Sequence, residues 1–160
     1  MGLVLVSLSL FVHVPDATAV RVQVWLPILP AYQDFESPDI MFGTNTNWKW
    51  PYWDWSTALL TGAFDVAADG DYTFTLNSDD GSRLSIDSTL VVNSWWDKPN
   101  YNVYGTIFLT AGKHPFWIDY YQLRGASGLD LYLPAGVTYA PDMPVPARST
   151  SWGRIKSLYR

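Results

Sequence analysis

The sequence predicts an all-β fold, an antiparallel β-sandwich or jelly roll, from three observations. Short segments of alternating apolar residues follow one another closely through the second half of the chain, which is typical of sandwiches rather than of strand–helix repeats. Aromatic residues make up 16% of the chain, and such residues favour strands. Eleven glycines and eleven prolines supply turns. The 160 residues are enough for one domain with its own core.

Charge and cysteine content exclude several classes of function. The net charge of −5 argues against nucleic-acid binding, which needs basic surface. The chain has no cysteine, which excludes thiol catalysis and disulfides, so stability must come from packing, bound metal or assembly.

The N-terminal segment, residues 1–19, has two interpretations. Leu3–Val14 is almost wholly apolar, and Ala17-Thr18-Ala19 resembles a signal cleavage site, but no Lys or Arg precedes the apolar run. The run is too short to span a membrane as a helix, so we expect no transmembrane span. If the segment is retained, it predicts a strand that can pair with another copy of the chain, through the alternating residues Val4, Val6, Leu8 and Leu10.

Residues 20–134 are expected to form the sandwich. Val20–Leu29 has alternating apolar residues, which predicts a strand that is stopped by Pro27 and Pro30. Ala31–Leu60 is expected to be irregular, and to be either functional or wrapped around the core. The strands predicted after it are Gly62–Ala67, Tyr72–Ser78, Arg83–Ile86, Leu90–Asn93, Gly105–Thr110, His114–Tyr121 and Gly128–Leu133.

Residues 135–160 are predicted to be a Pro-rich linker and a short amphipathic tail. Ser149 or Thr150 can cap a short helix there, with apolar residues on one side and basic residues on the other. Such a tail can dock on its own domain or serve as a sorting signal.

Two adjacent carboxylates form the main candidate site. The strand Tyr72–Ser78 runs directly into Asp79-Asp80-Gly81, and a second strand follows. Carboxylates this close repel each other unless a cation neutralises them, and calcium prefers such oxygen ligands. The alternative is a turn in which the aspartates bond only their own backbone.

The same residues carry a family resemblance. Tyr72–Asp87 resembles the signature of the protective-antigen-type domain, a β-sandwich module found in adhesins, glycosidases, proteases and toxins. Gly105–His114, Ile118–Tyr121 and Leu129–Leu133 resemble later segments of that domain, so the resemblance covers roughly Phe64 to Leu133.

The resemblance implies a calcium and sugar site. In sugar-binding members, two consecutive aspartates joined by a cis peptide hold calcium, which bridges to sugar hydroxyls. Asp79 and Asp80 stand at those positions, and Gln122 begins the loop 122–127 that would complete the metal shell. Asp87 and His114 match structural positions of the family.

Aromatic residues are the candidate sugar contacts. The segment Trp48–Trp55 contains four tryptophans, and the pair Trp95-Trp96 follows a predicted strand. We assign Trp95, Trp96 and Arg124 to sugar contact, with burial in the core or in a subunit interface as the alternative.

These features predict a non-catalytic protein. The sequence shows no Ser/His/Asp order, phosphate loop or HExxH motif, and adjacent carboxylates are too close for a glycosidase pair. We expect an extracellular, calcium-assisted carbohydrate-binding or adhesion module whose partners are glycans. The alternative is a structural subunit of an extracellular filament or surface layer, assembling through the N-terminal strand and aromatic surfaces.

Overall fold

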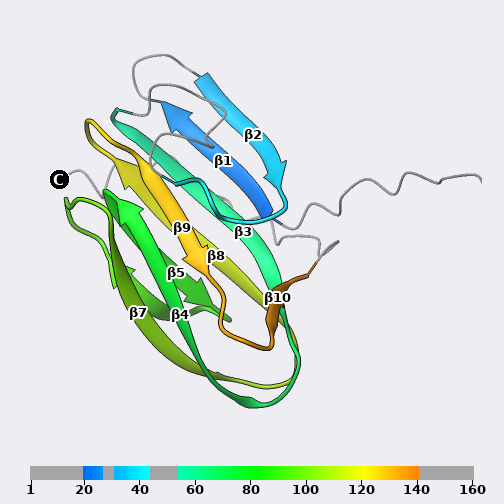
Figure 1. Cartoon of the computed structure of the whole chain (residues 1–160). Helices are drawn as coiled ribbons and strands as arrows, with labels where there is room; N and C mark the ends of the chain where they lie inside the picture. The colour runs from blue at the N-terminus through cyan, green and yellow to red at the C-terminus, as the bar shows by residue number, and fades with distance from the viewer. Residues whose placement is uncertain (1–19, 27–30, 44–53, 141–160) are drawn as a thin grey trace, which may run out of the picture.

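The computed structural model describes residues 20–26, 31–43 and 54–140, and these residues form an all-β sandwich (Figure 1). The ten strands are β1 (Val20–Leu26), β2 (Ala31–Ser37), β3 (Ser56–Val66), β4 (Gly70–Asp79), β5 (Gly81–Ile86), β6 (Thr89–Ser94), β7 (Tyr101–Leu109), β8 (Gly112–Gln122), β9 (Gly128–Tyr132) and β10 (Val137–Tyr139). Within this part of the chain no helix occurs, and so none could cross a membrane. The predicted fold class is confirmed.

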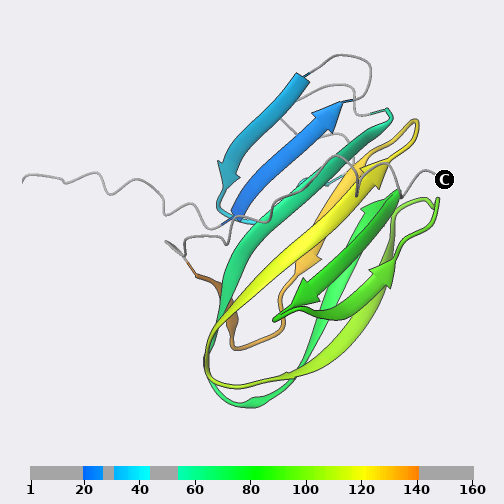
Figure 2. The ribbon, with the colours of Figure 1, turned by 180° about the vertical axis from the view of Figure 1, so that it is seen from behind.

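The strands form two antiparallel sheets. The large sheet has the order β2-β1-β3-β8-β5-β6, with β10 also paired to β3, and the small sheet has the order β7-β4-β9. Figure 1 looks from the side of the small sheet, and Figure 2 shows the large sheet from behind. The short segment Ile40–Phe42 runs beside β9, since Leu131 N donates to Ile40 O at 2.8 Å and Phe42 N to Leu129 O at 3.0 Å.

A stack of three phenylalanines joins the sheets. The ring of Phe64 on β3 lies 4.2 Å from that of Phe116 on β8, and both belong to the large sheet. The same ring lies 5.1 Å from that of Phe74, which comes from β4 of the small sheet. All three side chains are buried. Aromatic rings contribute large buried areas, so this stack is a substantial part of the core between the two sheets.

The segment expected to be irregular contains two strands. β2 occupies Ala31–Ser37 and pairs with β1 over its whole length, and β3 begins at Ser56 rather than at Gly62. β2 alternates only weakly in sequence, because Phe35 is flanked by the exposed Asp34 and Glu36 but its other inward positions are Gln33 and Ser37. It is an edge strand, and its Asp34 binds Arg21 at 2.9 and 2.5 Å. The start of β3 shows no alternation of apolar and polar residues, because successive residues of this central strand are buried on both faces. The prediction of irregular structure was therefore wrong at both ends of this segment.

Several predictions concern residues outside the described ranges or near their C-terminal end. The N-terminal strand with Val4, Val6, Leu8 and Leu10, the helix near Ser149, and most of the Trp48–Trp55 cluster lie outside the described residues. β10 occupies part of the stretch that was expected to be a linker, where it pairs with Phe64–Val66.

Asp87 and His114 hold the turn between β5 and β6 onto β8. Asp87 has a φ of 48°, and its carboxylate binds Nδ1 of His114, while Nε2 of His114 lies 2.9 Å from the carbonyl oxygen of Thr110. Burial alone would lower the pKa of His114, but its contacts with Asp87 and Thr110 outweigh burial, so this pKa is raised. Both ring nitrogens face acceptors, which suits the protonated imidazole.

Asp87→Asn is expected to lower stability only at mildly acidic pH. A raised histidine pKa in the folded state contributes stability that is complete below the unfolded pKa and is lost as pH rises through the folded pKa. Solvent screens the partly exposed Asp87, so the loss should be about 0.5 kcal/mol. Urea unfolding at about pH 5 and pH 8 would measure it, since the range spans histidine titration. An equal loss at both pH values would contradict an ionic role for the pair.

Candidate functional site

The two aspartates lie at the corner where the chain passes from the small sheet to the large one. β4 ends at Asp79, β5 begins at Gly81, and the Asp79–Asp80 peptide bond is cis. A Cβ at Gly81 would lie 2.0 Å from the ring of Tyr121, so the corner needs glycine to pack against β8. The strands on both sides thus hold the two carboxyl groups in one place.

Asp80 connects the corner to two loops. Its Oδ1 accepts a hydrogen bond from the backbone N–H of Lys98 at 3.2 Å, and its Oδ2 accepts one from the N–H of Leu123 at 2.8 Å. The side chain is 8% exposed. The interpretation of Asp80 as a simple turn residue is therefore too narrow, because its carboxylate binds backbone groups far away in the sequence.

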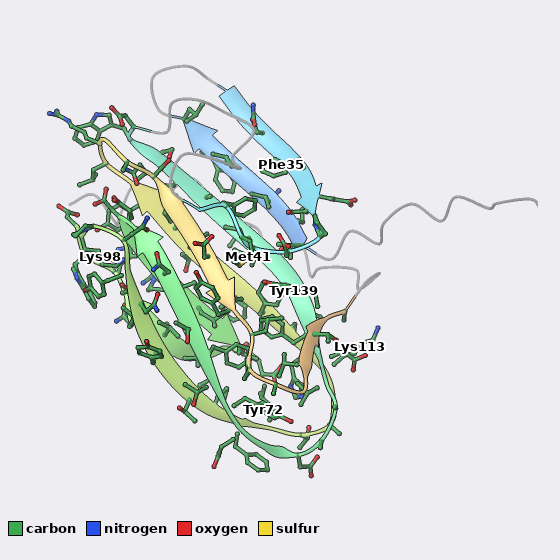
Figure 3. The ribbon with its side chains drawn as sticks, in the orientation of Figure 1. Phe35, Met41, Tyr72, Lys98, Lys113 and Tyr139 are labelled. Atoms are coloured by element: carbon green, nitrogen blue, oxygen red, sulfur yellow. The ribbon has the colours of Figure 1, made fainter. Side chains whose placement is uncertain are left out.

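Lys98 brings a buried positive charge to the corner. It is 6% exposed, and its ammonium donates to the carbonyl oxygen of Ser78 and to Ser78 Oγ, the latter at 2.9 Å. The ammonium also lies 4.7 Å from the centre of the Tyr101 ring. Figure 3 labels Lys98 beside the end of β4. Sequence analysis missed this residue, since one lysine in a turn carries no signal of burial.

The corner keeps an excess of negative charge. Burial and then the neighbouring Asp80 raise the pKa of Asp79, against the opposing effects of Lys98 and the backbone N–H of Asn100. Burial lowers the pKa of Lys98, although both aspartates act in the opposite direction. One ammonium thus faces two carboxylates, which favours a further cation or a hydroxyl donor at Asp79.

Gln122 was predicted as a metal ligand, but its side chain has other partners. Gln122 is fully buried; its Oε1 lies 3.0 Å from the hydroxyl of Tyr120, and its Nε2 donates to Ala126 O at 2.7 Å. The Tyr120 hydroxyl also donates to the carbonyl oxygen of Asp79 at 2.6 Å. Gln122 and Tyr120 thus support the backbone of the corner. In the described ranges, no three carboxylate or histidine side chains gather at one point.

The structure places the two candidate tryptophans in different surroundings. Trp96 is 45% exposed, and its Nε1 donates to the Tyr101 hydroxyl at 2.8 Å. Tyr101 is 40% exposed, pairs with Ser78 at the end of β4 and lies against the ammonium of Lys98, so these two rings border the corner on the side of Lys98. Trp95 is half-buried between Arg83, whose guanidinium lies 4.2 Å from its ring centre, and the edge of Tyr121. Tyr101 was missed because only its cross-strand position brings it to the site.

Arg124 belongs to the loop after β8. Its guanidinium lies 4.9 Å from the centre of the Trp55 ring, and Trp55 is 40% exposed. The adjacent Leu123 donates to Asp80, so the loop reaches the corner through its backbone. The structure therefore brings together Asp79, Asp80, Trp96 and the loop, and adds Lys98 and Tyr101.

Comparison with known proteins agrees with this architecture. The model of the PA14 domain matches residues 24–142. A solved anti-sigma factor domain-containing protein is similar, with 24% identity over 82% of this chain and a TM-score of 0.66. A second, from Clostridium clariflavum, has 20% identity over 84% of this chain and a TM-score of 0.60. This chain spans about half the length of each, 50% and 49%.

Two smaller structures are covered almost completely. The PA14 sugar-binding domain from an RTX adhesin has 17% identity over 79% of this chain and 95% of its own, with a TM-score of 0.60. The epithelial adhesin 9 A domain of Candida glabrata, solved in complex with Galb1-4GlcNAc, has 14% identity over 78% of this chain and 88% of its own, with a TM-score of 0.55. No curated protein matches the chain. The family model covers well over half of the sequence, and the chain therefore belongs to the PA14 domain family.

Proposed function

We propose that this chain is an extracellular, non-catalytic carbohydrate-binding or adhesion module. Its sugar would bind at the β4–β5 corner, with calcium between the aspartates and the sugar hydroxyls. The observation that carries the proposal is the pairing of Asp79 and Asp80 beside the exposed rings of Trp96 and Tyr101. Sugar recognition combines flat apolar faces with directed polar groups, and both are present here.

Each group has a distinct role in this proposal. The carboxylates of Asp79 and Asp80 would supply oxygen ligands to calcium, the type of ligand that the ion prefers. The hydrogen bonds to Asp80 hold its carboxylate in place before the ion arrives. Trp96 and Tyr101 would pack against the apolar face of the sugar ring. Multiple copies on a surface would raise the avidity of such a small site.

Relatives support the sugar class only by analogy. The similar adhesin domains bear titles that name a sugar-binding domain and a bound disaccharide. Their fold is shared with this chain at low identity, so the proposal depends on the corner of this chain itself.

Calcium is expected to raise the melting temperature of the wild type, and Asp79→Asn should abolish the rise. A ligand at a hundredfold excess over its Kd stabilises by about 2.7 kcal/mol, so a shift of several degrees is expected. Differential scanning calorimetry with calcium, magnesium and chelator measures it, and Asp71→Asn is the control because Asp71 is exposed on the same strand. An unchanged melting temperature in calcium would reject the ion.

Glycan binding is tested separately on a glycan array with calcium and with chelator. Binding that disappears in Asp79→Asn, while Asp71→Asn still binds, would place the sugar at the corner. An array without any bound glycan would reject the carbohydrate-binding function.

A further inference from the structure

The outer face of the small sheet carries a strip of polar and aromatic side chains that the corner site does not use. On β4, Phe74 and Leu76 point into the core, so Thr75 and Asn77 point outward. The outer strip consists of these two residues and their cross-strand neighbours, Asn102, Tyr104, Asp130 and Tyr132. Figure 3 looks onto this sheet.

Two tyrosines lie on either side of Thr75. Thr75 pairs with Tyr104 of β7 and with Tyr132 of β9. Tyr104 is 64% exposed and Tyr132 44% exposed. Since neighbouring strands lie about 4.8 Å apart, the backbones of the two tyrosines are roughly 10 Å apart. Two exposed rings with a small hydroxyl side chain between them are suited to the apolar face of a sugar.

The next row toward the corner is polar. Asn77 pairs with Asn102 and with Asp130, and Asn77 Nδ2 donates to Asn102 Oδ1 at 2.7 Å. Oδ1 of Asp130 accepts a hydrogen bond from Gly43 N at 2.7 Å. The amides of Asn77 and Asn102 are therefore oriented before any ligand arrives, and both keep unused donors or acceptors.

The strip is continuous with the proposed sugar site. Asp79 follows Asn77 by two residues, which places it on the same side of β4. At about 3.3 Å per residue, the distance along β4 from Asp79 to Thr75 is roughly 13 Å. A short oligosaccharide that starts at Asp79 therefore reaches the two tyrosines.

The charges of this face select the kind of glycan. The outward positions of β4, β7 and β9 include Asp71, Asp79 and Asp130 but neither lysine nor arginine. Anionic polysaccharides would be repelled there, whereas a neutral chain has hydroxyls to share with amides and carboxylates.

We propose that the outer strip is an extended subsite for a neutral oligosaccharide chain whose end sugar lies at Asp79. This inference rests on the proposed carbohydrate-binding function and adds that the ligand is a chain rather than a single terminal sugar. Tyr104 and Tyr132 contact sugar units further along the chain, and Asn77 with Asn102 bonds the unit between.

The test compares chain lengths. Cello-, manno- and galacto-oligosaccharides from monosaccharide to hexasaccharide, with oligogalacturonate as the anionic arm, are titrated by calorimetry into the wild type. We expect affinity for one neutral series to rise about tenfold or more between monosaccharide and tetrasaccharide, which is within reach of one aromatic contact. Tyr104→Ala with Tyr132→Ala should remove that rise and leave monosaccharide binding unchanged.

Two further variants provide controls. Tyr104→Phe with Tyr132→Phe keeps the rings and should keep most of the rise. Phe108→Ala removes another exposed ring of β7 that pairs opposite Asp71, far from the corner, and should change nothing.

The outcomes separate the two proposals. Monosaccharide binding without any gain in longer chains, or a gain that survives the double alanine variant, overturns the extended subsite and leaves the corner site standing. Preference for oligogalacturonate overturns the assignment to neutral chains. No binding to any of these sugars overturns the extended subsite, and the corner site is then decided by the glycan array alone.

Discussion

Replacing Asp80 with alanine is expected to lower the free energy of unfolding by about 3 kcal/mol, because one buried and one partly buried backbone N–H group lose their acceptor. Those groups belong to Lys98 and Leu123, in the loops on either side of the corner. Both loops would lose their hydrogen bond to Asp80, and the corner would lose a carboxylate, so calcium and glycan binding should also disappear. Equilibrium urea unfolding gives the stability, and calorimetry gives the binding.

Asp80→Asn separates the structural role from the ionic one. The amide keeps one carbonyl oxygen as an acceptor, so it should cost less stability than alanine, while it removes the charge that calcium needs. Asp71→Ala is the matched control, since that aspartate is exposed at the other end of β4. A loss below about 1 kcal/mol in Asp80→Ala would contradict the role of Asp80 as a buried acceptor.

Replacing Phe64 with alanine is expected to cost about 4 kcal/mol, the usual range for a buried phenylalanine. The ring contacts both Phe116 and Phe74, so its removal leaves a cavity at the junction of the two sheets. Phe64→Leu keeps much of the volume and should cost about 1.5 kcal/mol. Chemical denaturation of the three proteins measures their stabilities, which should fall in the order wild type, Phe64→Leu, Phe64→Ala.

The two substitutions differ in their effect on binding. Phe64 lies in the core, so the alanine variant should bind glycan normally at temperatures well below its melting point. Loss of binding in a folded Phe64→Ala protein would show that core packing controls the corner. A stability equal to that of the wild type would show that the stack does not join the sheets.

Much of the fold could be predicted from local patterns. Tyr72, Phe74 and Leu76 alternate with polar residues because β4 has one buried and one outward face, and this pattern is visible in the sequence. β8 shows the same alternation along His114–Tyr120. In contrast, the alternation of β2 is weak, because Phe35 is the one large apolar side chain among Gln33–Ser37, and the strand is held by pairing with β1 and by contacts such as Arg21 with Asp34.

The adjacency of Asp79 and Asp80, and hence the position of the candidate site, was determined by the sequence alone. The resemblance to the protective-antigen-type domain was also visible there, and the PA14 match confirms it. Local chemistry sufficed because residues next to each other in the chain must lie together in space.

Only the tertiary structure decided what surrounds that pair. Lys98 and Leu123 reach Asp80 from positions 18 and 43 residues away, and Tyr101 reaches the corner by pairing with Ser78. Thr75 lies between Tyr104 and Tyr132 because of the register of β4 with β7 and β9. Such contacts depend on strand order and register, which follow from the burial of a whole sheet face rather than from any one segment.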